Sequence, residues 1–195
     1  MPFGGDELNP TERVLAALPG EIGGYAVKKL LLPVEFGRAA MIACSEYDAL
    51  SPAAVIMLGQ AGGRSAITPE AVGRNLMNAR IPDNAGFSPV NEAVIPGGAE
   101  ELSSTLPLDA IVSAIRGEGL AAEISRDAGA YVCNSLLYSM LAHVSGSVPA
   151  GFIHVPFIRE QVEGVAGRGD TPFMEEADIL CGIIAAIRAV TGSIG

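Results

Sequence analysis

Cys133 is the residue whose type and position most directly suggest chemistry. It follows a strand-like segment at residues 121–125 and a turn formed by Asp127-Ala128-Gly129, which supplies a capping side chain and a flexible residue. From Ala130 onward apolar residues recur at helical spacing, which places Cys133 in the first turn of a helix. Unpaired N–H groups and the helix dipole favour a thiolate there. Cys133 is therefore either a reactive thiol or, like most free cysteines, a small buried hydrophobic residue.

A nucleophilic thiol needs a base and a third group that orients the base. The chain has two histidines, and His143 lies more than two turns beyond Cys133 on the same predicted helix, too far to reach the thiol. We expect His143 at the surface, at an interface, or hydrogen-bonded in the core. His154 lies in an otherwise apolar strand end, where it needs a polar partner, either a backbone group or a carboxylate. Glu70 follows another predicted strand and can supply that carboxylate, although alone it is an ordinary acid at a helix start.

Two further segments could contact a ligand. The glycine-rich turn Gly59-Gln-Ala-Gly-Gly-Arg64 has neither the Lys-Ser/Thr of a phosphate loop nor the dinucleotide spacing, so it indicates nucleotide binding only weakly. The same turn can equally offer backbone N–H groups to a carbonyl oxygen. Arg80 either contacts a substrate or forms a structural ion pair.

Strand and helix patterns alternate along the whole chain. Helices are expected after the cap residue Asn9, over residues 36–50, after the cap residue Thr68, over residues 108–116, from residue 130 and over residues 175–190. Strands are expected at residues 25–32, 53–58, 75–81, 121–125 and 151–157. This order predicts an α/β fold with three layers, in which helices cover both faces of a mostly parallel, mixed sheet. In such folds sites form at the carboxyl ends of strands, where Glu70, Cys133 and His154 are expected.

The composition limits the classes of function. A chain of 195 residues with 49% hydrophobic and 17% charged residues is expected to form one domain, residues 1–195, and not a disordered chain. A net charge of −10 disfavours binding to nucleic acid and to anionic membranes. Three scattered cysteines provide neither a disulfide framework nor a zinc site. With no signal-peptide pattern and no apolar run of membrane-spanning length, we expect a cytoplasmic protein.

Several motifs, in one order, resemble the type I pyroglutamyl peptidases (pyrrolidone-carboxylate peptidases). They are Gly59-Gln-Ala-Gly-Gly-Arg with Ile67-Thr-Pro-Glu70, Ala79-Arg-Ile-Pro-Asp-Asn84, Ser125-Arg-Asp-Ala-Gly-Ala-Tyr-Val-Cys133-Asn134 and Gly151-Phe-Ile-His154-Val-Pro-Phe157. The likeness covers nearly the whole chain. It implies a cysteine peptidase that removes N-terminal pyroglutamate from peptides and needs no metal or cofactor.

The resemblance also implies roles for individual residues. Cys133 attacks the carbonyl carbon and forms a thioester, His154 acts as base and then as acid, and Glu70 orients His154. The walls of the pyroglutamate pocket fall on Phe3, Tyr131 and the backbone of Val132, and Gln60 is a polar contact. By analogy with the family we expect a homo-oligomer, a dimer or a tetramer.

One departure from the family pattern concerns the start of the chain. Family members begin with a strand directly before the segment that corresponds to Met1-Pro2-Phe3, so we expect this chain to lack the first strand of the family and one pocket phenylalanine. We also expect the natural start to lie upstream of Met1. An alternative interpretation is a non-catalytic relative that acts as a binding or scaffold protein. A cysteine amidase with another acyl substrate is a third interpretation.

Overall fold

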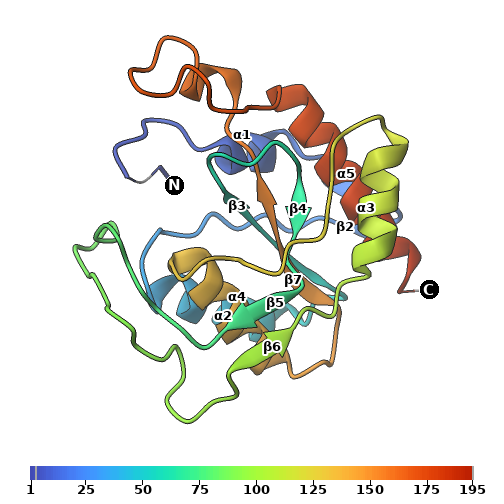
Figure 1. The fold of residues 1–195 in the computed structure, drawn as a ribbon. Coiled ribbons are helices and arrows are strands. Elements are labelled where there is room, and N and C mark those ends of the chain that lie inside the picture. The colour runs from blue at the N-terminus through green and yellow to red at the C-terminus, as the bar shows by residue number, and fades with distance from the viewer. Residues whose placement is uncertain (3, 195) are drawn as a thin grey trace.

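The computed structural model describes residues 1–2 and 4–194 (Figure 1). The helices are α1 (Pro10–Ala17), α2 (Arg38–Leu50), α3 (Leu108–Gly117), α4 (Val132–Val144), the 3-10 helix η1 (Arg159–Gln161) and α5 (Glu176–Gly192). The strands are β1 (Glu21–Ile22), β2 (Tyr25–Ala26), β3 (Val55–Gln60), β4 (Thr68–Pro69), β5 (Val72–Arg74), β6 (Glu101–Ser103) and β7 (Ala150–Val155). None of the helices in the described ranges is long and apolar enough to cross a membrane.

The central sheet is mixed, with the strand order β3-β7-β4. β3 and β7 run parallel, and their register places Gly59 beside His154. β4 pairs antiparallel with β7, so that Thr68 lies beside His154 on its other side. Two short antiparallel pairs, β1-β2 and β5-β6, flank this sheet. The predicted mixed sheet is confirmed, and its strand ends converge around His154.

Side chains of β7 alternate between two hydrophobic cores, which is why the fold has three layers. Ile153 and Val155 pack into a core formed with α1, α3 and α5. Ala150 and Phe152 point to the opposite face and pack into a core formed with α2 and α4. Figure 1 shows these two groups of helices on opposite sides of β3, β7 and β4. The predicted α/β fold, with helices on both faces of the sheet, is therefore confirmed.

Helix α4 begins next to Cys133, as the apolar spacing predicts. Its N-cap residue is Tyr131, whose side chain makes no capping hydrogen bond. The predicted capping role of Asp127 is therefore wrong. Asp127 Oδ1 accepts a hydrogen bond from the N–H of Gly129 at 3.0 Å, and Gly129 has φ +78°. The Asp127 side chain thus shapes the turn before the helix, where glycine provides the left-handed residue.

β3 forms one edge of the sheet, and no described strand pairs with its free side. A cavity of about 400 Å³, lined mainly by apolar side chains, follows this edge between α1, α2 and α5. At one end the cavity reaches residues 131–133, immediately before and within the first turn of α4. The free edge of β3 therefore leads to the predicted nucleophile.

Four predicted elements differ from the structure. The helix predicted after Thr68 is wrong: Thr68 and Pro69 form β4, because pairing with β7 overrides the local capping signal. The strand predicted at residues 75–81 is also wrong, since only Met77 forms a bridge there, with Glu92. Of residues 25–32 only β2 is a strand. Residues 121–125 form two isolated parallel bridges, through Ala122 and Ser125, instead of a continuous strand.

Candidate active site

Glu70 and His154 form a buried pair at the carboxyl end of β7. His154 Nδ1 lies 2.7 Å from Glu70 Oε1, and the side chains are 4% and 0% exposed. Glu70 reaches this position because β4 ends beside β7: the Glu70 N–H donates to the Phe152 carbonyl at 2.9 Å. A carboxylate on Nδ1 fixes the imidazole so that Nε2 is free for another partner. The structure thus brings together two residues that are 84 positions apart in the chain.

Cys133 lies against the same strand ends. A Cβ atom built on Gly59 would come within 3.0 Å of Cys133 Sγ, so the thiol occupies the space above Gly59. Gly59 is the register partner of His154 in the parallel β3-β7 pair. The Phe152 ring packs beside the imidazole, with ring centroids 4.7 Å apart. Cys133, His154 and Glu70 therefore form one cluster, assembled from α4, β7 and the residue after β4.

The ionisation of this cluster follows from its contacts. Burial on its own would lower the pKa of His154, but hydrogen bonds to Cys133 and Glu70, together with their negative charges, raise it to about 9. Burial on its own would raise the pKa of Glu70, but the hydrogen bond and charge of His154, with smaller contributions from Ser125 and Arg64, lower it. At neutral pH the imidazole is therefore protonated and the carboxylate ionised. This is the state that supports a thiolate–imidazolium pair.

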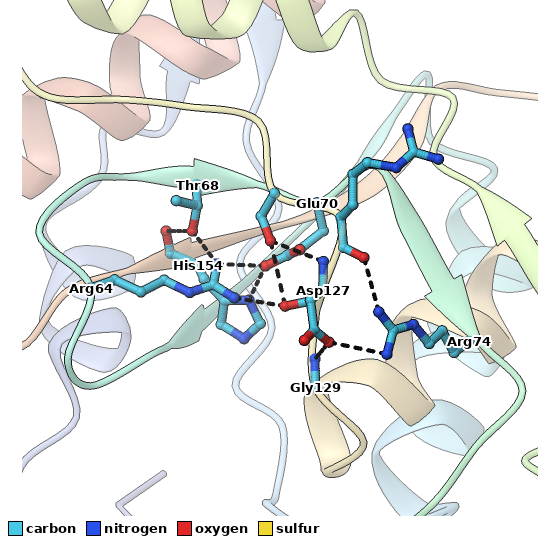
Figure 2. A network of polar contacts seen from close by, with 9 residues as sticks. Arg64, Thr68, Glu70, Arg74, Asp127, Gly129 and His154 are labelled. Carbon is cyan, nitrogen blue, oxygen red and sulfur yellow. Dashed lines mark hydrogen bonds and ion pairs between the residues drawn. The ribbon is translucent and has the colours of Figure 1, made fainter.

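Arg64, from the glycine-rich turn, contacts the same carboxylate. One of its guanidinium nitrogens donates to Glu70 Oε1 at 2.7 Å and also to Thr68 Oγ1. The other donates to the carbonyl of Asp127 at 2.7 Å. Figure 2 shows Arg64 reaching across His154 and Glu70 to the loop that holds Asp127. No role for Arg64 is predicted from the sequence, although its place in a turn after β3 is a usable signal.

Glu70 Oε2 is buried and accepts no hydrogen bond of normal geometry among the described residues. The Ser125 hydroxyl lies close enough to contribute to the lowered pKa of Glu70. In the structure the Ser125 hydroxyl donates to the carbonyl oxygen of Asp127, over a long distance of 3.4 Å between the two oxygens. Since a hydroxyl hydrogen rotates freely, Ser125 can turn toward either acceptor. Ser125 is a second residue of the site whose role is not predicted from the sequence.

Asn134 anchors the start of α4. Its side chain is fully buried; Oδ1 accepts from the N–H of Arg74 at 2.8 Å, and Nδ2 donates to the carbonyls of Arg74 and Leu76 at 2.9 and 2.8 Å. These bonds tie the residue after Cys133 to β5 and its following turn. A buried amide with three backbone partners holds its helix end in one position. Asn134 is thus a positioning residue for the thiol, and its place directly after Cys133 was the only sequence signal.

The predicted pocket residues do not all lie at the cavity. Gln60, Tyr131, Val132 and Cys133 line the cavity beside β3. Arg80 is exposed and does not line this cavity. Phe3 lies outside the described residues.

Gln60 and Tyr131 have partners that hold their side chains in place. Gln60 is buried, and its side chain bonds to Asp6 at 3.2 Å and to Gln161 at 2.8 Å. The Tyr131 hydroxyl donates to the Pro82 carbonyl at 3.0 Å. The cavity wall nearest the thiol is therefore an ordered surface.

The glycine-rich turn is less available as an N–H donor than the sequence suggests. The Ala61 N–H is already donated to the Val155 carbonyl at 2.9 Å, and Gly62 packs directly against the ring of Phe157. The first turn of α4 is a better source, because its N–H groups have no carbonyl one turn earlier in the helix.

Among the described residues no group of three His, Cys, Asp or Glu side chains could hold a metal ion. His143 lies at the surface, 2.7 Å from Asp48.

Comparisons with known proteins agree on one family. The sequence model of the family described as pyroglutamyl peptidase matches residues 1–193. A pyrrolidone-carboxylate peptidase of Levilactobacillus brevis is 41% identical over 192 residues, which cover 97% of this chain and 93% of the relative. The pyrrolidone-carboxylate peptidase of Escherichia fergusonii is 45% identical over 169 residues, which cover 85% and 79% of the two chains.

Solved structures agree as well. A mutant pyrrolidone carboxyl peptidase from Pyrococcus furiosus has a TM-score of 0.94 at 37% identity and covers 100% of this chain and 96% of that one. The pyroglutamyl peptidase I of Bacillus amyloliquefaciens has a TM-score of 0.91 at 36% identity, covering 97% and 90%. The family model, the relatives and the solved structures thus agree, and this chain belongs to the pyroglutamyl peptidase family.

Proposed function

We propose that this protein is a cysteine peptidase that removes an N-terminal pyroglutamyl residue from peptides, with Cys133 as nucleophile, His154 as acid and base, and Glu70 as the orienting group. The observation that carries the proposal is the buried Glu70–His154 pair, 2.7 Å apart, beside a thiol in the first turn of a helix. Membership of the pyroglutamyl peptidase family supports the same substrate class. The complete set of three residues argues against the alternative of a non-catalytic relative.

Acylation begins from the ion pair. With the pKa of His154 raised to about 9, the resting imidazole is protonated at neutral pH and can hold Cys133 as a thiolate. The thiolate attacks the carbonyl carbon that joins pyroglutamate to the next residue and forms a C–S bond. First-turn N–H groups of α4 stabilise the charge that develops on the carbonyl oxygen. As the C–N bond breaks, His154 transfers its Nε2 proton to the leaving amine.

Deacylation uses the same residues in reverse. The neutral imidazole, still held at Nδ1 by Glu70, takes a proton from a water molecule that attacks the thioester carbon. A C–O bond forms, the C–S bond breaks, and pyroglutamate leaves. The thiolate and the imidazolium are restored together. Arg64 also contacts Glu70, so a positive charge stays beside the carboxylate while the imidazole is neutral.

The cavity beside Cys133 fits an uncharged lactam ring. Its walls are mainly apolar, and Gln60, Tyr131 and Val132 line it near the thiol. A lactam offers one N–H donor and one carbonyl acceptor, which a few fixed polar groups can satisfy. We assign the polar contacts to the Gln60 side chain and the Val132 backbone, and one apolar wall to Tyr131. A role for Phe3 as a second wall stays a prediction, and so does a substrate contact by Arg80.

A fluorogenic pyroglutamyl amide tests this proposal. The protein is expected to release the fluorescent amine from the pyroglutamyl compound and to leave the matching prolyl and glutamyl amides intact. Cys133→Ala should abolish release, whereas Cys44→Ala, which alters a half-buried thiol on α2, should retain it. Turnover that survives Cys133→Ala, or equal turnover of all three amides, would contradict the proposal. Hydrolysis of another acyl amide alone would point to a different cysteine amidase.

Three related expectations stay predictions. The substrates are peptides with N-terminal pyroglutamate, the protein forms a dimer or a tetramer, and it is cytoplasmic. Light scattering coupled to size-exclusion chromatography measures the oligomeric state directly. Cell fractionation measures the location.

A further inference from the structure

We infer that Arg64 is a positioning residue of this site, which fixes Glu70 and the loop before α4 and balances the charge of the catalytic cluster. The inference rests on the function proposed above. It concerns a residue that touches neither the thiol nor the imidazole in any described contact.

The first observation is that Arg64 and His154 share one carboxylate oxygen. Glu70 Oε1 accepts from His154 Nδ1 at 2.7 Å and from Arg64 at 2.7 Å. An oxygen with two charged donors has both lone pairs engaged, which fixes the carboxylate plane and through it the imidazole. Glu70 is 0% exposed, so no water can replace Arg64 without a rearrangement.

The second observation is a charge balance. In the resting state proposed above, Cys133 and Glu70 are negative and His154 is positive, so the three side chains carry one net negative charge. Arg64 supplies the missing positive charge while remaining 26% exposed, so only part of its own hydration is lost. Among the described residues, the charged groups in contact with the Glu70–His154 pair are Arg64 and, in the proposed resting state, the Cys133 thiolate.

A nearby carboxylate does not disturb this balance. The side chain of Asp127 lies 3.4 Å from Arg74, so its charge has its own partner, and only its backbone carbonyl contacts Arg64. Figure 2 shows Arg64 on one side of Asp127 and Arg74 on the other. Arg64 thus contacts the backbone carbonyl of Asp127, whereas Arg74 contacts its carboxylate.

The third observation is that Arg64 joins three segments. It follows β3, it binds Thr68 and Glu70 at the end of β4, and it binds the Asp127 carbonyl in the turn that leads into α4. These segments carry the carboxylate and the thiol. The planar guanidinium provides donors in several fixed directions, whereas a lysine amine in the same place could keep the charge but not this set of bonds.

The experiment compares Arg64→Gln and Arg64→Lys with Arg74→Gln, a control that removes an equal charge beside the same Asp127 residue without touching Glu70. All proteins carry Cys44→Ala and Cys181→Ala, so that iodoacetamide reports only on Cys133. We expect Arg64→Gln to lower kcat by about tenfold to a hundredfold with a much smaller change in KM. Arg64→Gln also removes a positive charge. In a plot of the rate of Cys133 alkylation against pH, the fall in rate on the acid side should therefore move to higher pH. Arg64→Lys should restore the pH profile but only part of kcat.

Several results would overturn the inference. One is an Arg64→Gln protein with the parent's kcat and alkylation profile, and another is an equal loss in Arg74→Gln. If Arg64→Gln does not fold, Arg64→Lys still decides, because an unchanged kcat would exclude the positioning role. Alkylation needs no substrate, so it tests Arg64 even if the parent proves inactive on pyroglutamyl amides. Inactivity of the parent would contradict the proposed function, and only the alkylation profiles would then bear on Arg64.

Discussion

Gly59 leaves the space that Cys133 occupies. The two residues come from β3 and α4, and a Cβ atom on Gly59 would lie 3.0 Å from Cys133 Sγ and 2.6 Å from the ring of Phe152. Gly59 is also the register partner of His154. The absence of a side chain at this one position therefore lets the thiol approach the end of β7.

Gly59→Ala should damage both the site and the fold. The new methyl group has no room between Cys133 and Phe152, and overpacking of this kind costs about 1–3 kcal/mol of unfolding free energy. We expect lower urea stability together with a large loss of kcat, since the thiol must move. Gly117→Ala is the control, because a Cβ there meets nothing within 4 Å. Parent-like stability and activity in Gly59→Ala would show that the close approach is wrong.

The stability of the protein should fall at alkaline pH because of His154. Folding raises its pKa from 6.5 to about 9, so the native state holds this proton more tightly than the unfolded chain does. The stabilisation is fully present below pH 6.5 and is lost as the pH rises through about 9. Its size stays below about 3 kcal/mol, because the proton gained by His154 is partly offset by the proton that Cys133 gives up when the thiolate–imidazolium pair forms.

Two measurements check this pH dependence. NMR titration of the imidazole ring, with His143→Gln for assignment, should show His154 deprotonating near pH 9. Urea unfolding of the parent should lose more stability between neutral and alkaline pH than His154→Gln does, since that variant lacks the titrating group. A His154 ring that titrates near its ordinary value would contradict the thiolate–imidazolium pair.

Glu70→Gln should remove the orientation of the imidazole and part of its raised pKa. The amide keeps the shape of the carboxylate but loses the charge that holds both His154 and Arg64. We expect kcat to fall by about 10²- to 10⁴-fold, with a smaller effect on KM. The alkaline limb of the pH–rate profile should move to lower pH, because the pKa of His154 decreases. An unchanged alkaline limb would show that Glu70 does not act on His154.

Asn134→Ala should destabilise the start of α4. The substitution leaves the backbone N–H of Arg74 and the part-buried carbonyl of Leu76 without partners and removes one of the two donors to the Arg74 carbonyl, at a cost of about 2–4 kcal/mol. Asn75→Ala is a matched control: it also removes three side-chain bonds to backbone, but in an exposed loop, and should cost about 1 kcal/mol or less. Urea unfolding distinguishes the two. Equal losses would contradict the anchoring role of Asn134.

Much of this arrangement is readable from the sequence, because local patterns specify it. The apolar spacing after Ala130 predicts α4 and the place of Cys133, and the apolar run around His154 predicts β7 and the need for a polar partner. Glu70 could be proposed as that partner because it follows a strand. These inferences need only helix periodicity, strand composition and the rule that buried polar groups are paired.

The rest depends on contacts between distant segments. Thr68-Pro69 has the sequence of a helix start and becomes a strand because β7 offers it backbone partners. Arg64 and Asp127 are 63 positions apart, and no local pattern connects them. Asn134 acts through the backbone of β5, which periodicity does not place. The supporting contacts of the site are therefore the part that only the structure supplies.

The most direct test of the proposed chemistry is to trap the acyl-enzyme. The protein is mixed with a pyroglutamyl ester, quenched in acid within the turnover time, and digested for mass spectrometry. A pyroglutamyl thioester on Cys133, absent from Cys133→Ala and present in Cys181→Ala, is the predicted result. Rapid turnover of the ester with no adduct on Cys133, or with no effect of Cys133→Ala, would contradict the assignment of Cys133 as the nucleophile.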